Sequence, residues 1–264
     1  MRRVWPRTPD VEMQRAFAAW SSGPAPTAHA AVCGAEDAQR KAIMKAHEAV
    51  YKQLREYLLW LFHNKCAYCE ADYRSARVQV EHFRPKSRVT GEKDHPGYYW
   101  LMFDAHNLLP SCSLCNNKKR NRFPVSGRRA AAPDDDLTLE EPGLLNPYDD
   151  NDIDSHLEFV TDEEDEKLFG VAQKVGNSWK GHESIIGYGL NDDAKVRARQ
   201  LEMKAFLREF KDAFEDTERR AKLWRSLQDG SRQFSAACEA KVSAWIESVY
   251  QERKKYRTLG TTQN

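Results

Sequence analysis

Four cysteines lie in two pairs with the spacing of a metal site, Cys66 with Cys69 and Cys112 with Cys115. A two-residue gap lets both thiolates of one pair occupy one edge of a tetrahedron, and two such pairs complete the coordination that zinc prefers. The alternative for paired cysteines is a disulfide scaffold, which is typical of small secreted chains. In a chain of 264 residues with six cysteines, the pattern predicts one structural zinc ion.

An acid, an imidazole and two amides lie between and beside these pairs: Glu81, His82, Asn107 and Asn116. Glu81 offers the hard oxygen that Mg²⁺ or Mn²⁺ prefers, and His82 can accept a proton from an attacking water molecule. Neighbours in a strand point to opposite faces, so both serve one site only if the strand twists or ends there, as Pro85 favours. A Glu-His dipeptide alone is more often structural. Together the four residues are of the types that a one-metal nuclease needs, and the alternative is an inactive zinc ribbon whose Asn and His residues are ordinary caps and turns.

Charge is unevenly distributed, although the net charge is only +1. Residues 61–130 hold 13 Lys or Arg and 6 Asp or Glu, whereas residues 131–166 hold 15 acidic residues and no basic ones. A phosphodiester would meet this local field, so we expect Lys118, Lys119, Arg120 and Arg122 to contact phosphates. The alternative is a solvated basic face. The acidic block is expected to be a solvated surface segment, with an internal mask over the basic site as the alternative.

Other chemically suggestive residues have plainer explanations. His95 and His106 are expected in polar surface loops, and the aromatic cluster around Tyr98 is expected in the core and not stacked on bases. Cys33 and Cys238 are given no role. No apolar run is long enough to span a bilayer and no signal peptide is evident, so together with the cysteine usage a cytoplasmic protein is expected.

Periodicity divides the chain into four parts. Residues 1–63 predict an arm around a short helix at 11–20, then a long amphipathic helix over 37–63. The metal segment takes 64–126, where Ser113 is the expected N-cap of a helix carrying Cys115 and Asn116. An acidic linker or irregular segment, 127–190, contains a weak strand pair at 157–160 and 168–175. A C-terminal helical region, 191–264, contains helices at 194–214, 217–227 and 231–256.

Several short motifs together resemble HNH, or ββα-metal, endonucleases, and more narrowly the PtuB-type nucleases of Septu and retron anti-phage systems. They are Cys66-Ala67-Tyr68-Cys69-Glu70, Val80-Glu81-His82-Phe83-Arg84-Pro85-Lys86, Gly97-Tyr98-Tyr99-Trp100-Leu101, Asn107-Leu108-Leu109, Cys112-x-x-Cys115-Asn116, Asn121-Arg122-Phe123-Pro124 and Leu144-Leu145-Asn146-Pro147-Tyr148. The resemblance is strong over about 60–150 and weak in the C-terminal helices.

The resemblance implies a mainly α fold with a small ββα-metal module stapled by a four-cysteine zinc site. It makes His82 the general base, Asn107 the brace of the loop that holds it, and Glu81 with Asn116 the ligands of a catalytic Mg²⁺ or Mn²⁺. Two departures stand out: the first acid is Glu where Asp is commoner, and the stretch from His82 to Asn107 is longer than in minimal members.

The function expected from these residues and this resemblance is a metal-dependent endonuclease acting in an anti-phage complex. DNA is the favoured substrate. An RNA-directed nuclease, for instance on tRNA, and an inactive nucleic-acid-binding zinc module are the alternatives. The resemblance implies a PtuA-like ATPase partner, because this chain has no Gly-x4-Gly-Lys-Ser/Thr loop of its own. The N-terminal residues Val4, Trp5, Phe17 and Trp20 are the surface expected to dock it.

Overall fold

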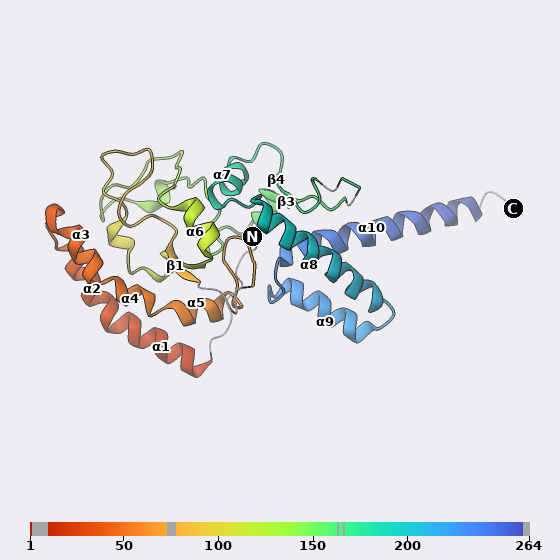
Figure 1. The fold of residues 1–264 in the computed structure, drawn as a ribbon, viewed down its shortest axis with the longest axis horizontal. Coiled ribbons are helices and arrows are strands. Elements are labelled where there is room, and N and C mark those ends of the chain that lie inside the picture. The colour runs from red at the N-terminus through yellow and green to blue at the C-terminus, as the bar shows by residue number, and fades with distance from the viewer. Residues whose placement is uncertain (2–9, 73–77, 163, 166, 261–264) are drawn as a thin grey trace.

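The computed structural model describes residue 1 and residues 10–72, 78–162, 164–165 and 167–260. Within these ranges the protein is predominantly helical, with two small antiparallel sheets of two strands each. Helices from the N-terminal part lie beside the first sheet, and the C-terminal helices extend past the second (Figure 1). The mainly α architecture is therefore confirmed.

The N-terminal part contains one more helix than expected. Helix α1, Val11–Ser22, is followed at once by α2, Pro24–Cys33, so the expectation of an irregular arm after the first helix is wrong. Pro24 and Pro26, which argued against a helix here, lie in the first turn of α2. Proline is tolerated there, because the N–H that it lacks would have no partner within the helix.

The long helix expected over 37–63 is broken into α3, Asp37–Ala46, α4, Glu48–Lys52, and α5, Arg55–Leu61. At the second break the carbonyl of Val50 accepts a hydrogen bond from the Trp20 indole Nε1 at 2.8 Å. The amide of Leu54 binds the Tyr51 carbonyl at 3.1 Å, one residue short of α-helical pitch. The bends keep Tyr51 and Leu54 both buried while the chain curves around the first sheet.

Of the aromatic residues expected to dock a partner, Trp20 is a core residue and Phe17 is half-buried against the same core. Trp20 is only 5% exposed, and the ring of Phe17 stacks on Tyr57 with centroids 4.8 Å apart. The expectation is therefore wrong for Trp20, which is buried, whereas Phe17 keeps part of its surface exposed. Val4 and Trp5 lie outside the described residues.

A hairpin and one helix form the central part of the fold. Strands β1, Gln79–His82, and β2, Leu108–Ser111, pair antiparallel with Glu81 opposite Leu109 and His82 opposite Leu108. Helix α6, Ser113–Lys119, follows β2 directly and contacts β1. Cys112, not Ser113, is the N-cap: its Sγ accepts a hydrogen bond from the amide of Cys115. Ser113 lies one residue too late for that bond.

The long connection between β1 and β2 is ordered by two short 3₁₀ helices, Tyr99–Leu101 and Ala105–Asn107. Tyr98, Trp100 and Phe103 are buried within it. The aromatic cluster is therefore core, as expected, and it supports the strand that carries His82.

The acidic segment is more structured than a linker. Leu144 and Leu145 are fully buried, and Glu140 is 6% exposed. Strands β3, Leu157–Phe159, and β4, Ala172–Lys174, pair antiparallel where the weak strand pair was expected. The expectation of a solvated segment is wrong for these apolar residues and for Glu140, because they complete the core over the hairpin.

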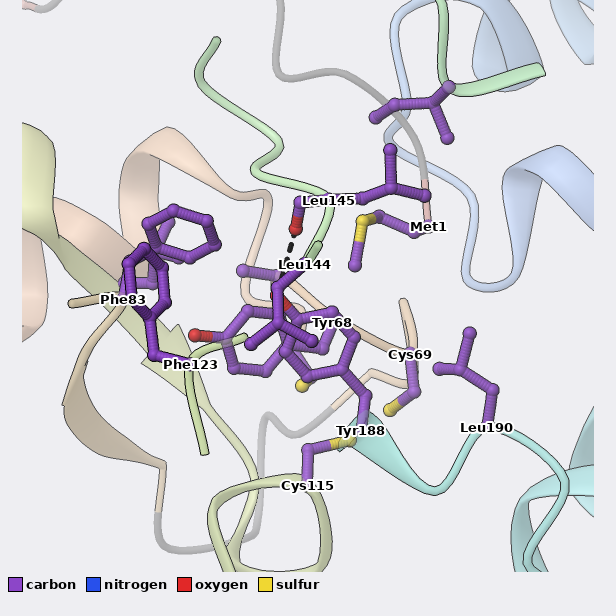
Figure 2. Close-up of a cluster of buried hydrophobic side chains, with 14 of the residues drawn as sticks. Met1, Tyr68, Cys69, Phe83, Cys115, Phe123, Leu144, Leu145, Tyr188 and Leu190 are labelled. Atoms are coloured by element: carbon purple, nitrogen blue, oxygen red, sulfur yellow. Dashed lines mark hydrogen bonds between the residues drawn. The ribbon is translucent and has the colours of Figure 1, made fainter. Parts of the chain in front are cut away.

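The core beside the cysteines is aromatic. Helix α7, Trp179–Tyr188, ends in Tyr188, whose ring stacks on Tyr68 with centroids 3.9 Å apart. The Tyr188 hydroxyl donates to the carbonyl of Leu145 at 2.8 Å. Figure 2 shows this pair next to Cys69 and Cys115, so the cysteine cluster is part of the main core.

The three helices expected at the C-terminal end are present as α8, Asp193–Asp212, α9, Thr217–Gln228, and α10, Ser235–Gly260. They bury a second core that includes Phe206, Phe210, Leu227 and Val242. The far end of α10 projects from the rest of the molecule (Figure 1). No helix in the described ranges has both the length and the apolar character needed to cross a membrane.

Candidate metal centre and active site

The four cysteines converge on one point. All four Sγ atoms lie within 4.8 Å of one another and all four residues are buried, with Cys69 and Cys112 Sγ 4.0 Å apart. Zinc–sulfur bonds of about 2.3 Å place tetrahedral sulfurs about 3.8 Å apart, so these four thiols need only a small contraction to hold the ion. The donor set fits zinc.

Local backbone geometry explains how each pair turns. After Cys69 the chain reverses through Glu70, whose φ of 62° is left-handed, and the Glu70 amide binds the Cys66 carbonyl at 3.0 Å. Two amides point at sulfur: that of Cys112 at Cys66 Sγ and that of Cys115 at Cys112 Sγ, each at 3.4 Å. Such N–H···S contacts stabilise thiolates and orient them toward one centre.

Two buried cations of α8 lie near the cysteines. Lys195 and Arg199 are 3% and 1% exposed. Burial acts to lower the pKa of Lys195, but the thiols of Cys115 and Cys69 oppose it, and the pKa is raised overall. Four thiolates around Zn²⁺ carry a net charge of −2, which two nearby cations offset. The surroundings therefore suit a loaded zinc site as well as the ligands do.

Glu81, His82 and Asn116 all line one cavity of about 690 Å³ beside α4 and α5. β1 ends at His82, which resolves the conflict between alternating side chains and a shared site. His82 Nε2 lies 3.0 Å from the carbonyl oxygen of Met102. A carbonyl only accepts, so Nε2 carries the proton and Nδ1 has the lone pair.

The surroundings of His82 keep it neutral. Burial is the main cause, followed by the charge of Lys86, and together they hold the pKa of His82 well below its ordinary value of 6.5. The ring also packs edge-on against Tyr51, with centroids 4.7 Å apart. At neutral pH this histidine is therefore in its neutral form, the form in which an imidazole can accept a proton.

Glu81 is held by a lysine that was expected to contact phosphate. Lys119 Nζ lies 2.9 Å from Glu81 Oε1 and donates to the His82 carbonyl at 2.8 Å, and the lysine side chain has no exposed surface. Lys119 therefore orients Glu81 and is not available to nucleic acid. The reason is its place on the inner face of α6, which sequence charge alone does not reveal.

Asn107 ties together the backbone around His82. Its Oδ1 accepts from the Arg84 amide at 2.7 Å, and its Nδ2 donates to the carbonyls of Arg84 and Leu101, both at 3.1 Å. This is the geometry that a loop brace requires. Its effect on catalysis stays a prediction.

A buried glutamate supports the same loop from the acidic segment. Glu140 accepts from Arg84 Nε at 2.7 Å, from the Tyr98 hydroxyl at 2.5 Å and from the Ala130 amide at 3.0 Å. Sequence reasoning missed this residue, because a glutamate in an acidic block carries no local sign of burial. Arg84 is thus held at its backbone by Asn107 and at its side chain by Glu140.

Asn116 is oriented by its neighbour on β1. Its Nδ2 donates to Gln79 Oε1, which leaves the acceptor Oδ1 as the atom that could serve as a ligand. Carboxylate and amide oxygens are hard donors, so Glu81 and Asn116 fit Mg²⁺ or Mn²⁺ as the thiols fit zinc.

The remaining polar candidates divide into internal and surface groups. Lys118 pairs with Asp192 at 3.3 Å and Arg122 pairs with Glu183, whereas Arg120 lines the cavity. His95 Nε2 donates to the Ala130 carbonyl at 2.7 Å, which is a structural role, and His106 is exposed. Of the four basic residues expected at phosphates, Arg120 keeps the most suitable position.

Comparisons with known proteins support the resemblance. No model of a protein family matches the chain. The Septu protein PtuB of Bacillus mycoides (strain KBAB4) is 37% identical over 167 residues, which are 58% of this chain and 53% of that protein. The resemblance to PtuB-type proteins is confirmed. The chain spans about half the length, or less, of the curated relatives it matches.

Two further relatives carry related names. A retron Vc95 putative HNH endonuclease of Vibrio cholerae serotype O1 biovar El Tor is 29% identical, with 38% of this chain and 49% of that protein covered. The Septu protein PtuA of Bacillus mycoides is 34% identical over 37% of this chain, and the match covers 14% of that protein. The first of these relatives is thus named as a putative endonuclease and the second as a Septu protein.

Proposed function

We propose that the protein is a metal-dependent nuclease of the HNH type that hydrolyses phosphodiester bonds. The observation that carries the proposal is the arrangement of β1, β2 and α6, which brings Glu81, His82 and Asn116 to one basic-rimmed cavity. The names of the relatives, PtuB and putative HNH endonuclease, support the same reaction class.

Each residue has a role that its contacts allow. Glu81 and Asn116 would hold one Mg²⁺ or Mn²⁺, which supplies Lewis-acid stabilisation of the phosphate and of the leaving oxygen when bound. His82 accepts the proton of the attacking water at Nδ1, since Nε2–H is directed to Met102 O. Lys119 keeps one carboxylate oxygen of Glu81 engaged and fixes its rotamer, and Asn107 fixes the loop that follows His82.

The test is digestion of labelled DNA and RNA, side by side, with purified protein and Mg²⁺ or Mn²⁺. His82→Ala should lower the cleavage rate by about 10²–10⁴-fold, the usual loss when a general base is removed. His106→Ala is the matched control, because this histidine is exposed. Glu81→Ala and Asn116→Ala should instead raise the concentration of divalent ion required. Unchanged turnover of His82→Ala would refute the mechanism, and nucleic-acid binding without cleavage in the wild type would favour the inactive zinc module.

We further propose that this nuclease acts as an effector in Septu-type anti-phage defence, together with a PtuA-like ATPase. The support is the PtuB and PtuA names of its relatives. Co-expression with such an ATPase followed by size-exclusion chromatography with light scattering tests the complex. Separate elution at micromolar concentration would contradict it.

A further inference from the structure

The cavity that contains Glu81 and His82 continues into a second one. The first measures about 690 Å³ and the second about 710 Å³, and both are lined by Glu48, Lys86 and Asn121. Together the two linings contain eight Lys or Arg side chains and three carboxylates. The groove is therefore strongly positive along its length, with the candidate catalytic residues at one end.

The walls of this groove come from distant parts of the sequence. Helices α3, α4 and α5 form one wall, and the residues after β1 and after α6 form the other. The breaks between α3, α4 and α5 bend this wall, and within it α4 contacts β1 and α5 contacts β2 (Figure 1). A straight helix over 37–63 would not follow the sheet in this way.

Some cations of the groove already have partners within the fold. Arg40 pairs with Asp37 and lies over the ring of Tyr99, and Lys52 pairs with Glu48 at 2.8 Å. These side chains help to build the wall.

Three other cations have no such structural task. Lys41, Lys45 and Arg88 are exposed, and none of them forms an ion pair with another residue in the described ranges. Lys41 and Lys45 are four residues apart on α3, so they lie on the same face about 6 Å apart along the axis. Three unpaired cations along one groove repel one another, and a bound polyanion would offset this electrostatic repulsion.

We propose that the sugar-phosphate backbone of a nucleic acid lies along this groove, with Lys41, Lys45 and Arg88 holding phosphates away from the scissile bond. The inference rests on the proposed nuclease function and adds the binding track to it. It also moves the main phosphate contacts from the end of α6 to α3 and to the loop after β1. Bases point out of such a track, so the contacts favour backbone recognition without sequence preference.

The test is the salt dependence of binding, measured by fluorescence anisotropy in buffer without Mg²⁺, Mn²⁺ or chelator, so that no cleavage occurs and the structural zinc stays bound. The triple variant Lys41→Gln, Lys45→Gln and Arg88→Gln removes three charges. Each phosphate contact contributes a slope of about 0.9 for duplex DNA and about 0.7 for single strands in a plot of log K against log salt. The magnitude of the slope should fall by about 2–3 in the triple variant. For a duplex, the ratio of the wild-type to the variant binding constant should therefore decrease about 40-fold as salt rises from about 50 mM to 200 mM.

A double variant on α9, Arg219→Gln and Lys222→Gln, is the matched control, because these cations line a separate cavity of about 390 Å³. It should leave the slope unchanged. Duplex DNA, single-stranded DNA and RNA are measured in parallel, and the class with the largest change is the preferred occupant. In cleavage assays the triple variant should raise KM and leave kcat nearly unchanged.

Two outcomes would contradict the proposed binding track, and they have different consequences for the nuclease proposal. If the wild type cleaves nucleic acid but the triple variant keeps its slope, or the α9 control loses as much, the track is wrong and the nuclease proposal stands. If the wild type neither binds nor cleaves any of the three nucleic acids, both proposals fail.

Discussion

Replacing Glu140 by Ala should be among the most damaging changes outside the cysteine site. The carboxylate has no exposed surface and accepts three hydrogen bonds, from Arg84, Tyr98 and the amide of Ala130. Removal leaves all three donors facing an apolar gap. The Arg84 side chain is 15% exposed, so it recovers only part of its hydration.

The size of the loss follows from these contacts. Breaking a buried ion pair by removing one partner costs about 3–5 kcal/mol, and each buried donor left unsatisfied costs about 1–3 kcal/mol. Relaxation lets some donors find water, so we expect a total of about 4 kcal/mol. For a chain of this size each kcal/mol lowers Tm by about 2–4 °C, which predicts a drop of about 8–16 °C.

The assay is thermal and urea unfolding of Glu140→Ala beside Glu141→Ala. Glu141 is the adjacent residue but is exposed, and its carboxylate accepts a hydrogen bond from the Ser126 hydroxyl. Its replacement should shift Tm by less than about 2 °C. Asn107 still holds the Arg84 backbone in Glu140→Ala, so nuclease activity at low temperature should fall less than in Asn107→Ala. A wild-type Tm for Glu140→Ala would refute the reasoning that this glutamate holds the loop.

Other buried groups give three further predictions. Cys66→Ser should abolish the binding of one zinc ion per chain, measured by elemental analysis, and should yield insoluble protein, because a structural zinc contributes about 10–16 kcal/mol in small zinc domains. Cys33→Ser is the control, and folded wild-type protein without zinc would contradict the site. Lys119→Met should lower the free energy of unfolding in urea by about 3–5 kcal/mol, because it leaves Glu81 unpaired, and adding Glu81→Gln should recover much of this loss. The control Lys118→Met breaks an exposed pair and should lower it by less than about 1 kcal/mol, so equal losses would be inconsistent with a buried pair. Burial and Lys86 lower the pKa of His82 below 6.5, so as the pH falls the unfolded chain takes up this proton before the folded one does. The contribution of His82 to the free energy of unfolding should be fully present above about pH 6.5 and decline below it by up to about 1.4 kcal/mol per pH unit, and His82→Gln should remove this part of the acid dependence.

Short-range patterns in the sequence predicted much of the secondary structure and the chemistry of the site. The helices at 194–214, 217–227 and 231–256 correspond to α8, α9 and α10, since apolar residues at helical spacing need only a neighbouring core. The two Cys-x-x-Cys pairs likewise predicted a buried four-thiol cluster, because ligand spacing within a turn is a local property.

Other features of the N-terminal part were not readable from the sequence. The helix expected over 37–63 has an uninterrupted apolar face, yet it breaks where the Trp20 indole meets the Val50 carbonyl. The partner of that carbonyl lies 30 residues away, so no local pattern reports the break. The same breaks bend the helical wall of the groove that carries Lys41 and Lys45.

The sequence by itself determined which residues could bind zinc, which could bind a hard divalent ion and which could transfer a proton, because these capacities follow from side-chain chemistry and close spacing. Only the tertiary structure decided which of the charged residues are internal. Lys119 lies inside the fold and pairs with Glu81, and Glu140 pairs with Arg84, which is 56 residues away in the sequence. A charge looks the same in sequence whether it is solvated or buried, and only packing decides which partner offsets its loss of water.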